Sequence, residues 1–251
     1  MAKMNVLITG MSGLIGGVVK EQLADKYELS ALNRSGVAGV KCHQADISDL
    51  DAIRPAFTGQ DVVVHLAAKA GEYTWEELQA VNVAGTYNVF EAAREAGVKR
   101  VIYASSGATI AGWEKEEPYL SIAQGRYDDA PTSWPMLTHQ TPIRPSGIYG
   151  ASKVWGEALA RHYADTTDLS IICLRIGHVT EEDRPLSARD YAVWCSQRDI
   201  ARMVELAVAA PIDLPFATLF VLSDNRWGYR DLSHAHKVLG FEPQDRAEDH
   251  R

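Results

Sequence analysis

Short apolar runs alternate with longer stretches of mixed apolar and polar residues along most of the chain. The short runs are rich in β-branched and aliphatic residues and are predicted to be strands at 5–9, 28–32, 40–43, 62–66, 100–105, 170–176 and 218–222. The longer stretches carry apolar residues at helical spacing and are predicted to be helices at 14–24, 75–96, 149–164 and 199–209. Because such alternation requires crossover connections, the pattern predicts an α/β fold with a doubly wound parallel sheet of about seven strands.

Residues 113–146 interrupt this alternation, since they combine several prolines with two tryptophans and two tyrosines and show no clean period. A connection of this length inside a compact domain is usually functional or disordered, and disordered segments are poor in aromatic residues. We therefore predict an insertion that covers a substrate. No repeat or linker divides the rest of the chain, so residues 1–251 are expected to form one domain with a small portion after residue 176.

Composition and charge narrow the class of protein. The 251 residues are 46% hydrophobic and carry a formal net charge of −8, which argues against a nucleic-acid or anionic membrane partner. Cys42, Cys173 and Cys195 are far apart and lack the spacing of metal ligands, so no metal site is expected. An odd set of scattered cysteines, no signal-peptide pattern and no apolar run of membrane-spanning length together predict a soluble cytoplasmic protein.

Three glycines, Gly10, Gly13 and Gly16, lie between the first predicted strand and the first predicted helix in "VLITGMSGLIGG". A glycine at each position permits a tight turn, a close approach of backbone to a pyrophosphate, and close packing of helix on strand. The helix N-terminus then faces the phosphates with its unpaired N–H groups. The strand before and the helix after make a dinucleotide site the preferred interpretation of this motif.

Several motifs occur together in the order of one known family. "TGMSGLIG", "HLAA" (65–68), "VNVAGTYNVFEAA" (81–93), "VIYASS" (101–106) and "YGASK" (149–153) resemble an extended short-chain dehydrogenase/reductase of the NAD-dependent epimerase/dehydratase group. The resemblance implies one NAD(P)-binding Rossmann domain over residues 1–251, with substrate-binding elements after 176. The insertion at 113–146 has no counterpart of that length in the relatives that this chain resembles. The residues it implies for the cofactor site are Gly10, Ser12, Gly13, Leu14, Ile15, Gly16, Asn33, Arg34, Asp46, Ile47, Leu66, Ala67, Ala68, Asn82, Tyr149, Lys153 and Ile176. Asn82 is expected to have mainly a structural role there.

The end of the second strand bears on the choice between NAD and NADP. An acid at this position binds the ribose hydroxyls of NAD, whereas a neutral residue beside a base accommodates the phosphate of NADP. The chain has Asn33 followed by Arg34, and a guanidinium pairs with phosphate through two hydrogen bonds. We therefore predict a preference for NADP, with NAD as the alternative.

Tyr149 and Lys153 are four residues apart on a predicted helix and therefore share one face. A free tyrosine has a pKa near ~10, so it needs a nearby cation to act as a base at neutral pH. The Lys153 ammonium and the cationic nicotinamide are expected to lower that pKa and make Tyr149 the acid–base group. Ser106, at the end of the fifth strand, is predicted to hold the substrate oxygen as the third catalytic residue, and Ser105 is the alternative.

The short C-terminal portion resembles the uronate dehydrogenases of this group, in "YGASKVWGEALARHYAD" and in "LRIGHVTEE" (174–182). That resemblance implies a substrate site at Ser106 and Arg175, with Arg175 holding a sugar carboxylate. A buried structural ion pair is the other interpretation of Arg175. Gly107, Ala108 and Ala70 stand where those relatives have polar substrate contacts, so a different sugar or sugar acid is expected.

Two further classes of protein remain open on the sequence. One is an epimerase or dehydratase that recycles a tightly bound cofactor, and the other is a regulator that binds NADP without turnover. An intact Ser106, Tyr149 and Lys153 favour an oxidoreductase over the regulator.

The helices at 75–96 and 149–164 carry more apolar side chains than one contact with a sheet requires. These are Val83, Tyr87, Phe90, Trp155, Leu159 and Tyr163. An apolar helix face in water invites a partner, and the family resemblance implies that the partner is a second subunit. A homodimer with a four-helix interface is expected.

Overall fold

The computed structural model describes residues 3–71 and 73–250, and its central element is one sheet. The strands are β1 (Asn5–Thr9), β2 (Glu28–Asn33), β3 (Lys41–Gln44), β4 (Val62–His65), β5 (Arg100–Ser106), β6 (Ser170–Ile176) and β7 (Phe216–Val221). They pair only in parallel, in the order β3-β2-β1-β4-β5-β6-β7. The predicted α/β class and the seven strands are confirmed, with strand ends shifted by one or two residues.

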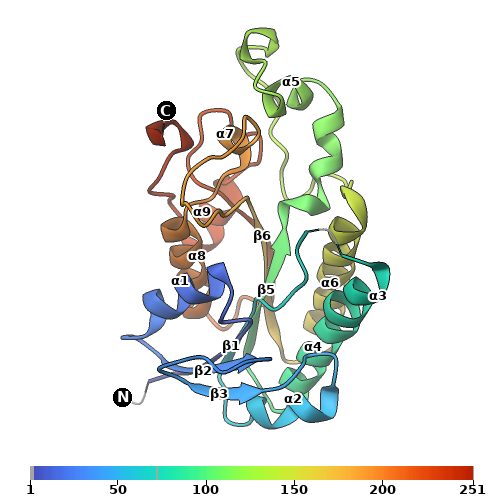
Figure 1. The fold of residues 1–251 in the computed structure, drawn as a ribbon, viewed down its shortest axis with the longest axis vertical. Coiled ribbons are helices and arrows are strands. Elements are labelled where there is room, and N and C mark those ends of the chain that lie inside the picture. Colours follow the sequence, from blue (N-terminus) through green and yellow to red (C-terminus); the bar gives the residue numbers. More distant parts are fainter. Residues whose placement is uncertain (1–2, 72, 251) are drawn as a thin grey trace.

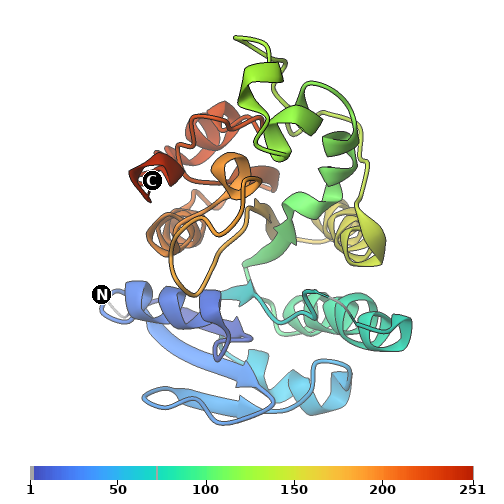
Figure 2. The ribbon, with the colours of Figure 1, turned by 45° about the horizontal axis from the view of Figure 1, so that its top comes forward.

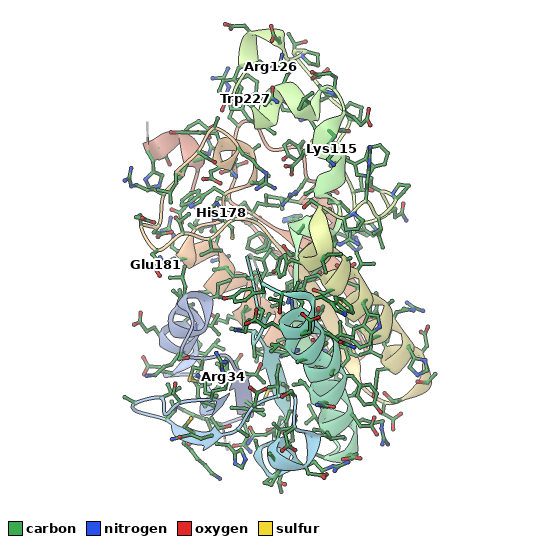
Figure 3. The ribbon with its side chains drawn as sticks, turned by 45° about the vertical axis from the view of Figure 1, so that its right-hand side comes forward. Arg34, Lys115, Arg126, His178, Glu181 and Trp227 are labelled. Atoms are coloured by element: carbon green, nitrogen blue, oxygen red, sulfur yellow. The ribbon has the colours of Figure 1, made fainter. Side chains whose placement is uncertain are left out.

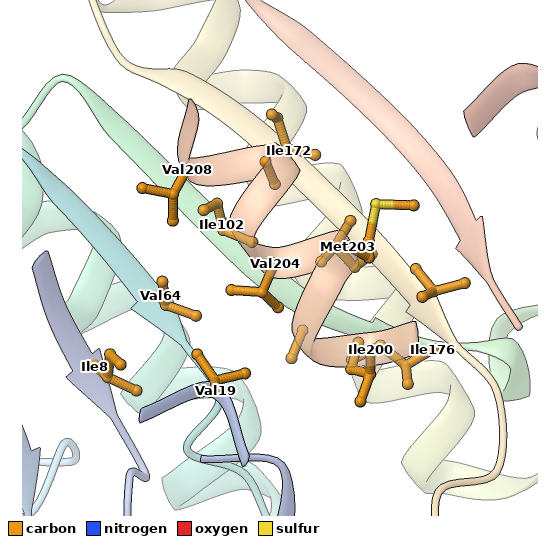
Figure 4. Packing of buried hydrophobic residues seen from close by; sticks show 14 of the residues in the cluster. Ile8, Val19, Val64, Ile102, Ile172, Ile176, Ile200, Met203, Val204 and Val208 are labelled. Carbon is orange, nitrogen blue, oxygen red and sulfur yellow. The ribbon is translucent and has the colours of Figure 1, made fainter. Parts of the chain in front are cut away.

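Helices cover both faces of the sheet (Figures 1 and 2). On one face α1 (Leu14–Leu23) packs beside α8 (Gln197–Ala209), and on the other α2 (Leu50–Phe57), α4 (Thr86–Glu95) and α6 (Gly147–Thr166) lie together. Figure 4 shows Val19 of α1 near Ile8 and Val64. It also shows Val204 and Val208 of α8 near Ile102, and all of these residues belong to one apolar cluster. Because both faces are buried, the central strands β4 and β6 are buried along their whole length rather than on alternate residues, whereas the edge strand β3 is polar and partly exposed.

The predicted helix at 75–96 is helical over its length but is not one regular α-helix. A capped turn, α3 (Trp75–Leu78), continues as the π-helix η1 (Gln79–Gly85) and then as α4. A π segment of this kind inserts an extra residue into the helix and often lies at a functional site. The predictions for α1, α6 and α8 match the structure within two residues.

Four α-helices of the described residues were not predicted from the sequence. These are α2, which contains Pro55 and buries only Ile53 and Phe57, and the short α5 (Tyr119–Ala123), α7 (Asp190–Val193) and α9 (Ser233–Leu239). Each is too short to show a helical period in its apolar residues.

Residues 113–146 form a folded lobe with the C-terminal segments rather than a free loop. Its elements are η3 (Ala111–Lys115), α5 (Tyr119–Ala123) and η4 (Tyr127–Asp129), which pack against α7 (Asp190–Val193) and the chain after β7. A separate apolar cluster fills it, formed by Ile110, Tyr119, Ile122, Leu137, Ala192, Val193, Phe220, Leu222 and Tyr229. The backbone N–H of Leu137 donates to the carbonyl of Tyr229 at 2.7 Å. Figure 1 shows α5 at the end of the molecule opposite the N-terminal strands.

Two of the six apolar residues predicted for the helix surface belong to the core instead. Phe90 is fully buried and its ring contacts Tyr103, at 5.8 Å between centroids. Tyr163 is also buried, and its hydroxyl donates to Glu91 at 2.7 Å. Tyr87 is exposed as predicted, and Trp75 adds a further exposed ring on the same helical stretch.

No helix within residues 3–71 and 73–250 has both the length and the apolar character that a membrane span requires.

Candidate active site

The turn from β1 to α1 contains three glycines, and at two of them, Gly10 and Gly16, no other residue fits. Gly10 has φ +72°, and a Cβ there would lie 2.8 Å from the backbone of Ala67. A Cβ on Gly16 would lie 2.4 Å from the carbonyl oxygen of Gly10. The backbone of α1 therefore starts directly beside the end of β1, and no side chain caps its first N–H groups. An uncapped helix N-terminus of this kind suits a phosphate group.

A cavity of about 530 Å³ opens at this turn, where the strand order reverses between β1 and β4. Such a switch point is where open α/β sheets bind ligands. The predicted cofactor residues that line it are Gly10, Ser12, Gly13, Asn33, Arg34, Asp46, Ile47, Leu66, Ala67 and Ala68. The predicted residues outside its lining are Leu14, Ile15, Gly16, Asn82, Tyr149, Lys153 and Ile176. Lys69 and Val81 line it although they were not predicted.

The end of this cavity that lies beside β2 leaves polar groups unpaired. Asn33 is buried, and its Nδ2 donates to Ser12 Oγ at 2.6 Å while its Oδ1 has no hydrogen-bond partner. The guanidinium of Arg34 forms no hydrogen bond or ion pair with any residue in 3–71 or 73–250. Figure 3 shows Arg34 beside the N-terminal strands, whereas His178 and Trp227 lie toward the other end of the molecule. An orphaned buried acceptor beside a glycine cradle fits a dinucleotide.

Asn82 connects the loop after β4 to the helix that carries Tyr149. Its Oδ1 accepts from the backbone N–H of Lys69 at 2.8 Å, and its Nδ2 donates to the Lys69 carbonyl at 2.9 Å. The same Nδ2 lies 3.1 Å from Ser152 Oγ, which donates to the Tyr149 carbonyl at 2.7 Å. The π-helix η1 places Asn82 at this junction, so its contacts are those of the predicted structural role.

The structure brings Ser106 and Tyr149 together. Their side chains lie close together at the carboxyl end of β5, where the Ser106 hydroxyl acts on the pKa of Tyr149, and Ser106 Oγ also accepts from the N–H of Ala108 at 3.1 Å. Ser105, the alternative, is buried and donates to Glu157 Oε1 at 2.5 Å. Only the Ser106 hydroxyl therefore lies beside Tyr149.

Lys153 lies one turn after Tyr149 and is buried. Its Nζ donates to the Ala104 carbonyl at 2.8 Å and lies 5.8 Å from the centroid of the Tyr149 ring. Burial lowers the pKa of Lys153 to about 8, although the Glu157 carboxylate opposes the shift. Burial also raises the pKa of Tyr149, and the nearby Ser106 hydroxyl offsets this rise only in part. The expected lowering of the Tyr149 pKa by Lys153 together with the cationic nicotinamide stays a prediction for the protein with its cofactor bound.

Arg175 forms a buried ion pair inside the protein. Its Nε and Nη2 donate to the two carboxylate oxygens of Glu157 at 2.9 and 2.8 Å, and both side chains are almost fully buried. This geometry matches the structural interpretation of Arg175. With both donors on this edge taken up by Glu157, a substrate carboxylate has no bidentate partner there.

Charged residues that were not predicted lie on the other side of Ser106. Arg230 packs against Gly107, where a Cβ would lie 1.9 Å from Nη1, and both Arg230 and Arg189 contact Glu114 of η3. These residues come from segments without a regular period. In the sequence, only their charge among aromatic neighbours indicates that they could belong to a site.

Comparison with known proteins gives a consistent picture. The family model described as the NAD dependent epimerase/dehydratase family matches residues 6–185. The NAD-dependent glucose-6-phosphate dehydrogenase of Haloferax volcanii is 31% identical, over 96% of this chain and 93% of that protein. The L-arabinose 1-dehydrogenase (NAD(P)(+)) of the same organism is 32% identical, over 96% of each. The crystal structure of uronate dehydrogenase from Agrobacterium tumefaciens superposes with a TM-score of 0.84 at 33% identity, covering 99% of this chain and 87% of that one.

Replacing Arg175 tests its place in the ion pair. Arg175→Met should lower the free energy of unfolding by ~3–5 kcal/mol, because it leaves a buried carboxylate without its partner. The double variant Arg175→Met/Glu157→Leu should recover most of that loss, since both charges are then gone. Urea denaturation measures both. If the single variant loses less than ~1 kcal/mol, the pair is not structural.

Proposed function

This chain belongs to the NAD-dependent epimerase/dehydratase family, and we propose that within it the protein is an oxidoreductase that oxidises a hydroxyl of a sugar or sugar acid with a nicotinamide dinucleotide. The observation that carries the proposal is that Tyr149 lies beside Ser106, with Lys153 buried one turn along α6 and its Nζ 5.8 Å from the centroid of the Tyr149 ring. Relatives of nearly the same length carry the names of sugar dehydrogenases. An intact acid–base group at the end of β5 favours turnover over a purely regulatory role.

The cavity at the β1–α1 turn fits the dinucleotide. Gly10, Ser12 and Gly13 would hold its pyrophosphate with backbone groups, and Asn33 would meet the adenosine ribose with its unpaired Oδ1. When bound, the cofactor supplies the hydride acceptor and a positive charge on its ring. We infer a preference for NADP, because no carboxylate follows β2 and the unpaired guanidinium of Arg34 is available for a phosphate.

Tyr149 is proposed to act as the base. Its phenolate takes the proton of the substrate hydroxyl while the carbon bearing that hydroxyl loses hydride, so the alcohol becomes a carbonyl and the two electrons leave with the hydride. Ser106 donates a hydrogen bond to the substrate oxygen and holds it beside Tyr149. Lys153 supplies positive charge one turn away, which stabilises the phenolate once it forms. Because burial raises the pKa of Tyr149 in the protein alone, oxidation should accelerate as the pH rises toward that pKa.

The substrate site differs from the one the uronate dehydrogenase resemblance implied. Gly107 and Ala108 follow Ser106, and Arg230 fills the space beside Gly107. Polar substrate contacts expected at those positions are therefore replaced by a guanidinium from the chain after β7. We infer that the substrate is a sugar recognised in a different way.

We also propose a homodimer in the cytoplasm. Tyr87 and Trp75 are exposed on the α3–α4 stretch, and the half-buried Val83, Trp155 and Leu159 lie on the same pair of helices. The three cysteines are free, which suits a reducing compartment.

Removing the Tyr149 hydroxyl tests the catalytic proposal. Tyr149→Phe should lower kcat by ~10³-fold or more, because proton transfer is lost while the ring is kept. Binding of the cofactor, measured by fluorescence titration, should stay within ~2-fold of the wild type, since Tyr149 does not line the cavity. A variant that keeps more than ~10% of the wild-type kcat would remove Tyr149 from this role.

Arg34 is the residue on which the NADP preference depends. Arg34→Ala should weaken NADP binding by ~10- to 150-fold, the equivalent of losing a charge-assisted hydrogen bond of ~1.5–3 kcal/mol. NAD binding should hardly change. Arg126→Ala is the control, because Arg126 pairs with Glu117 and Asp129 far from the cavity. Calorimetric titration measures all of these, and tighter binding of NAD than of NADP by the wild type contradicts the preference.

The dimer is tested by light scattering at micromolar concentration. The wild type should have twice the 27.6 kDa mass of one chain. Tyr87→Glu should yield monomers, because it places a charge in the apolar helix face, whereas Ile212→Glu alters an exposed residue after α8 and should leave the mass unchanged. A wild-type mass equal to one chain rules the dimer out.

A further inference from the structure

One carboxylate holds two arginines together next to the candidate catalytic serine. Glu114 accepts from Nε and Nη2 of Arg189 at 2.6 and 2.8 Å, and from Nη2 of Arg230 at 3.1 Å. The three residues come from η3 in the insertion, from the start of α7 and from the chain after β7. Figure 3 marks this region by Lys115, the neighbour of Glu114.

The cluster is enclosed and lies close to the reacting groups. The Glu114 side chain is 14% exposed and that of Arg230 is 2% exposed, whereas Arg189 keeps 38% of its surface in contact with solvent. Arg230 rests on Gly107 and its Nη2 lies 3.4 Å from the Gly107 carbonyl. Gly107 directly follows Ser106, so the cluster borders the space beside the Ser106 and Tyr149 hydroxyls.

Two guanidinium groups that converge on one point are the usual means by which proteins recognise a carboxylate or a phosphate. Here the carboxylate they recognise belongs to the protein. Burial opposes the charge of Glu114, yet Arg189 and Arg230 keep its pKa below the usual value, so it is ionised at neutral pH. A second anion would have to compete with Glu114 for these donors, and displacing Glu114 would leave its carboxylate buried without a partner.

We propose that Glu114 determines specificity by taking the place of an acidic group on the substrate. The enzyme then accepts an uncharged aldose and rejects the uronic acid or sugar phosphate of the same configuration. This inference rests on the proposed sugar oxidoreductase function and adds the charge class of its substrate. It also gives the insertion a role, because η3 carries Glu114 into the site.

The test compares matched sugars on the wild type and on Glu114→Gln. One set of sugars is D-galactose and D-galacturonate. The other set is D-glucose, D-glucuronate and D-glucose 6-phosphate. Each sugar is assayed with NAD and with NADP. The wild type should favour the aldose of each set by ~100-fold or more in kcat/KM, because Glu114 already occupies the donors that an acidic group on the substrate would need. Glu114→Gln should raise the relative kcat/KM for the charged sugars at least ~10-fold, because both arginines become available to them.

Glu116→Gln is the matched control, because Glu116 is in the same segment but pairs with the exposed Arg144 at 2.9 Å. It should leave the preference unchanged. Thermal denaturation of each variant shows whether it is folded. If Glu114→Gln does not fold, the preference of the wild type for the aldose or for the charged sugar still tests the inference. A wild type that oxidises uronates or sugar phosphates as well as aldoses overturns the inference but not the proposed function. A protein that binds cofactor and oxidises none of these sugars contradicts the proposed function itself.

Discussion

The position of the candidate active site depends on the carboxylate of Glu157. Ser105 at the end of β5 and Arg175 at the end of β6 both donate to it, so α6 is held against two adjacent strands by hydrogen bonds to one side chain. Lys153 lies one turn before Glu157 and donates to the carbonyl of Ala104, which fixes a third point. Because these groups are buried, each bond forms in a medium of low dielectric constant, and loss of any one partner leaves an uncompensated group. The hydroxyl of Tyr149 is thereby presented to Ser106.

The fold could be predicted from the sequence because its signals are local. The apolar runs at β1, β5 and β6 and the glycines at 10, 13 and 16 each report a backbone requirement that does not depend on distant residues. The π-helix η1 could not be predicted, because the inserted residue leaves the apolar period of the 75–96 stretch almost unchanged. The burial of Phe90 and Tyr163 also escaped prediction. Helical spacing shows which residues share a face but not what packs against it.

The candidate site was predicted in part. Residues with a local signal in the sequence were predicted, and contacts that depend on tertiary structure were not. Residues next to motifs, such as Ser106, Tyr149 and Asn33, occur where the sequence indicated. The partner of a charged side chain is set by tertiary structure, so neither the pairing of Arg175 with Glu157 nor the cluster around Glu114 could be derived. The cofactor end of the candidate site leaves Asn33 Oδ1 unpaired. At the other end Arg175 and Arg230 pair with the protein's own carboxylates, while Arg175 Nη1 and Arg230 Nε have no hydrogen-bond partner.

The central claim is that Tyr149 and Ser106 serve a net oxidation of a sugar. The most direct measurement follows deuterium from an aldose labelled on its carbon atoms, with the cofactor and the sugar products analysed by NMR. The account predicts that reduced cofactor accumulates with one deuterium on its nicotinamide ring for each oxidised sugar formed. Deuterium that returns to the sugar, with an epimer or a dehydrated sugar as product and no accumulation of reduced cofactor, would contradict it.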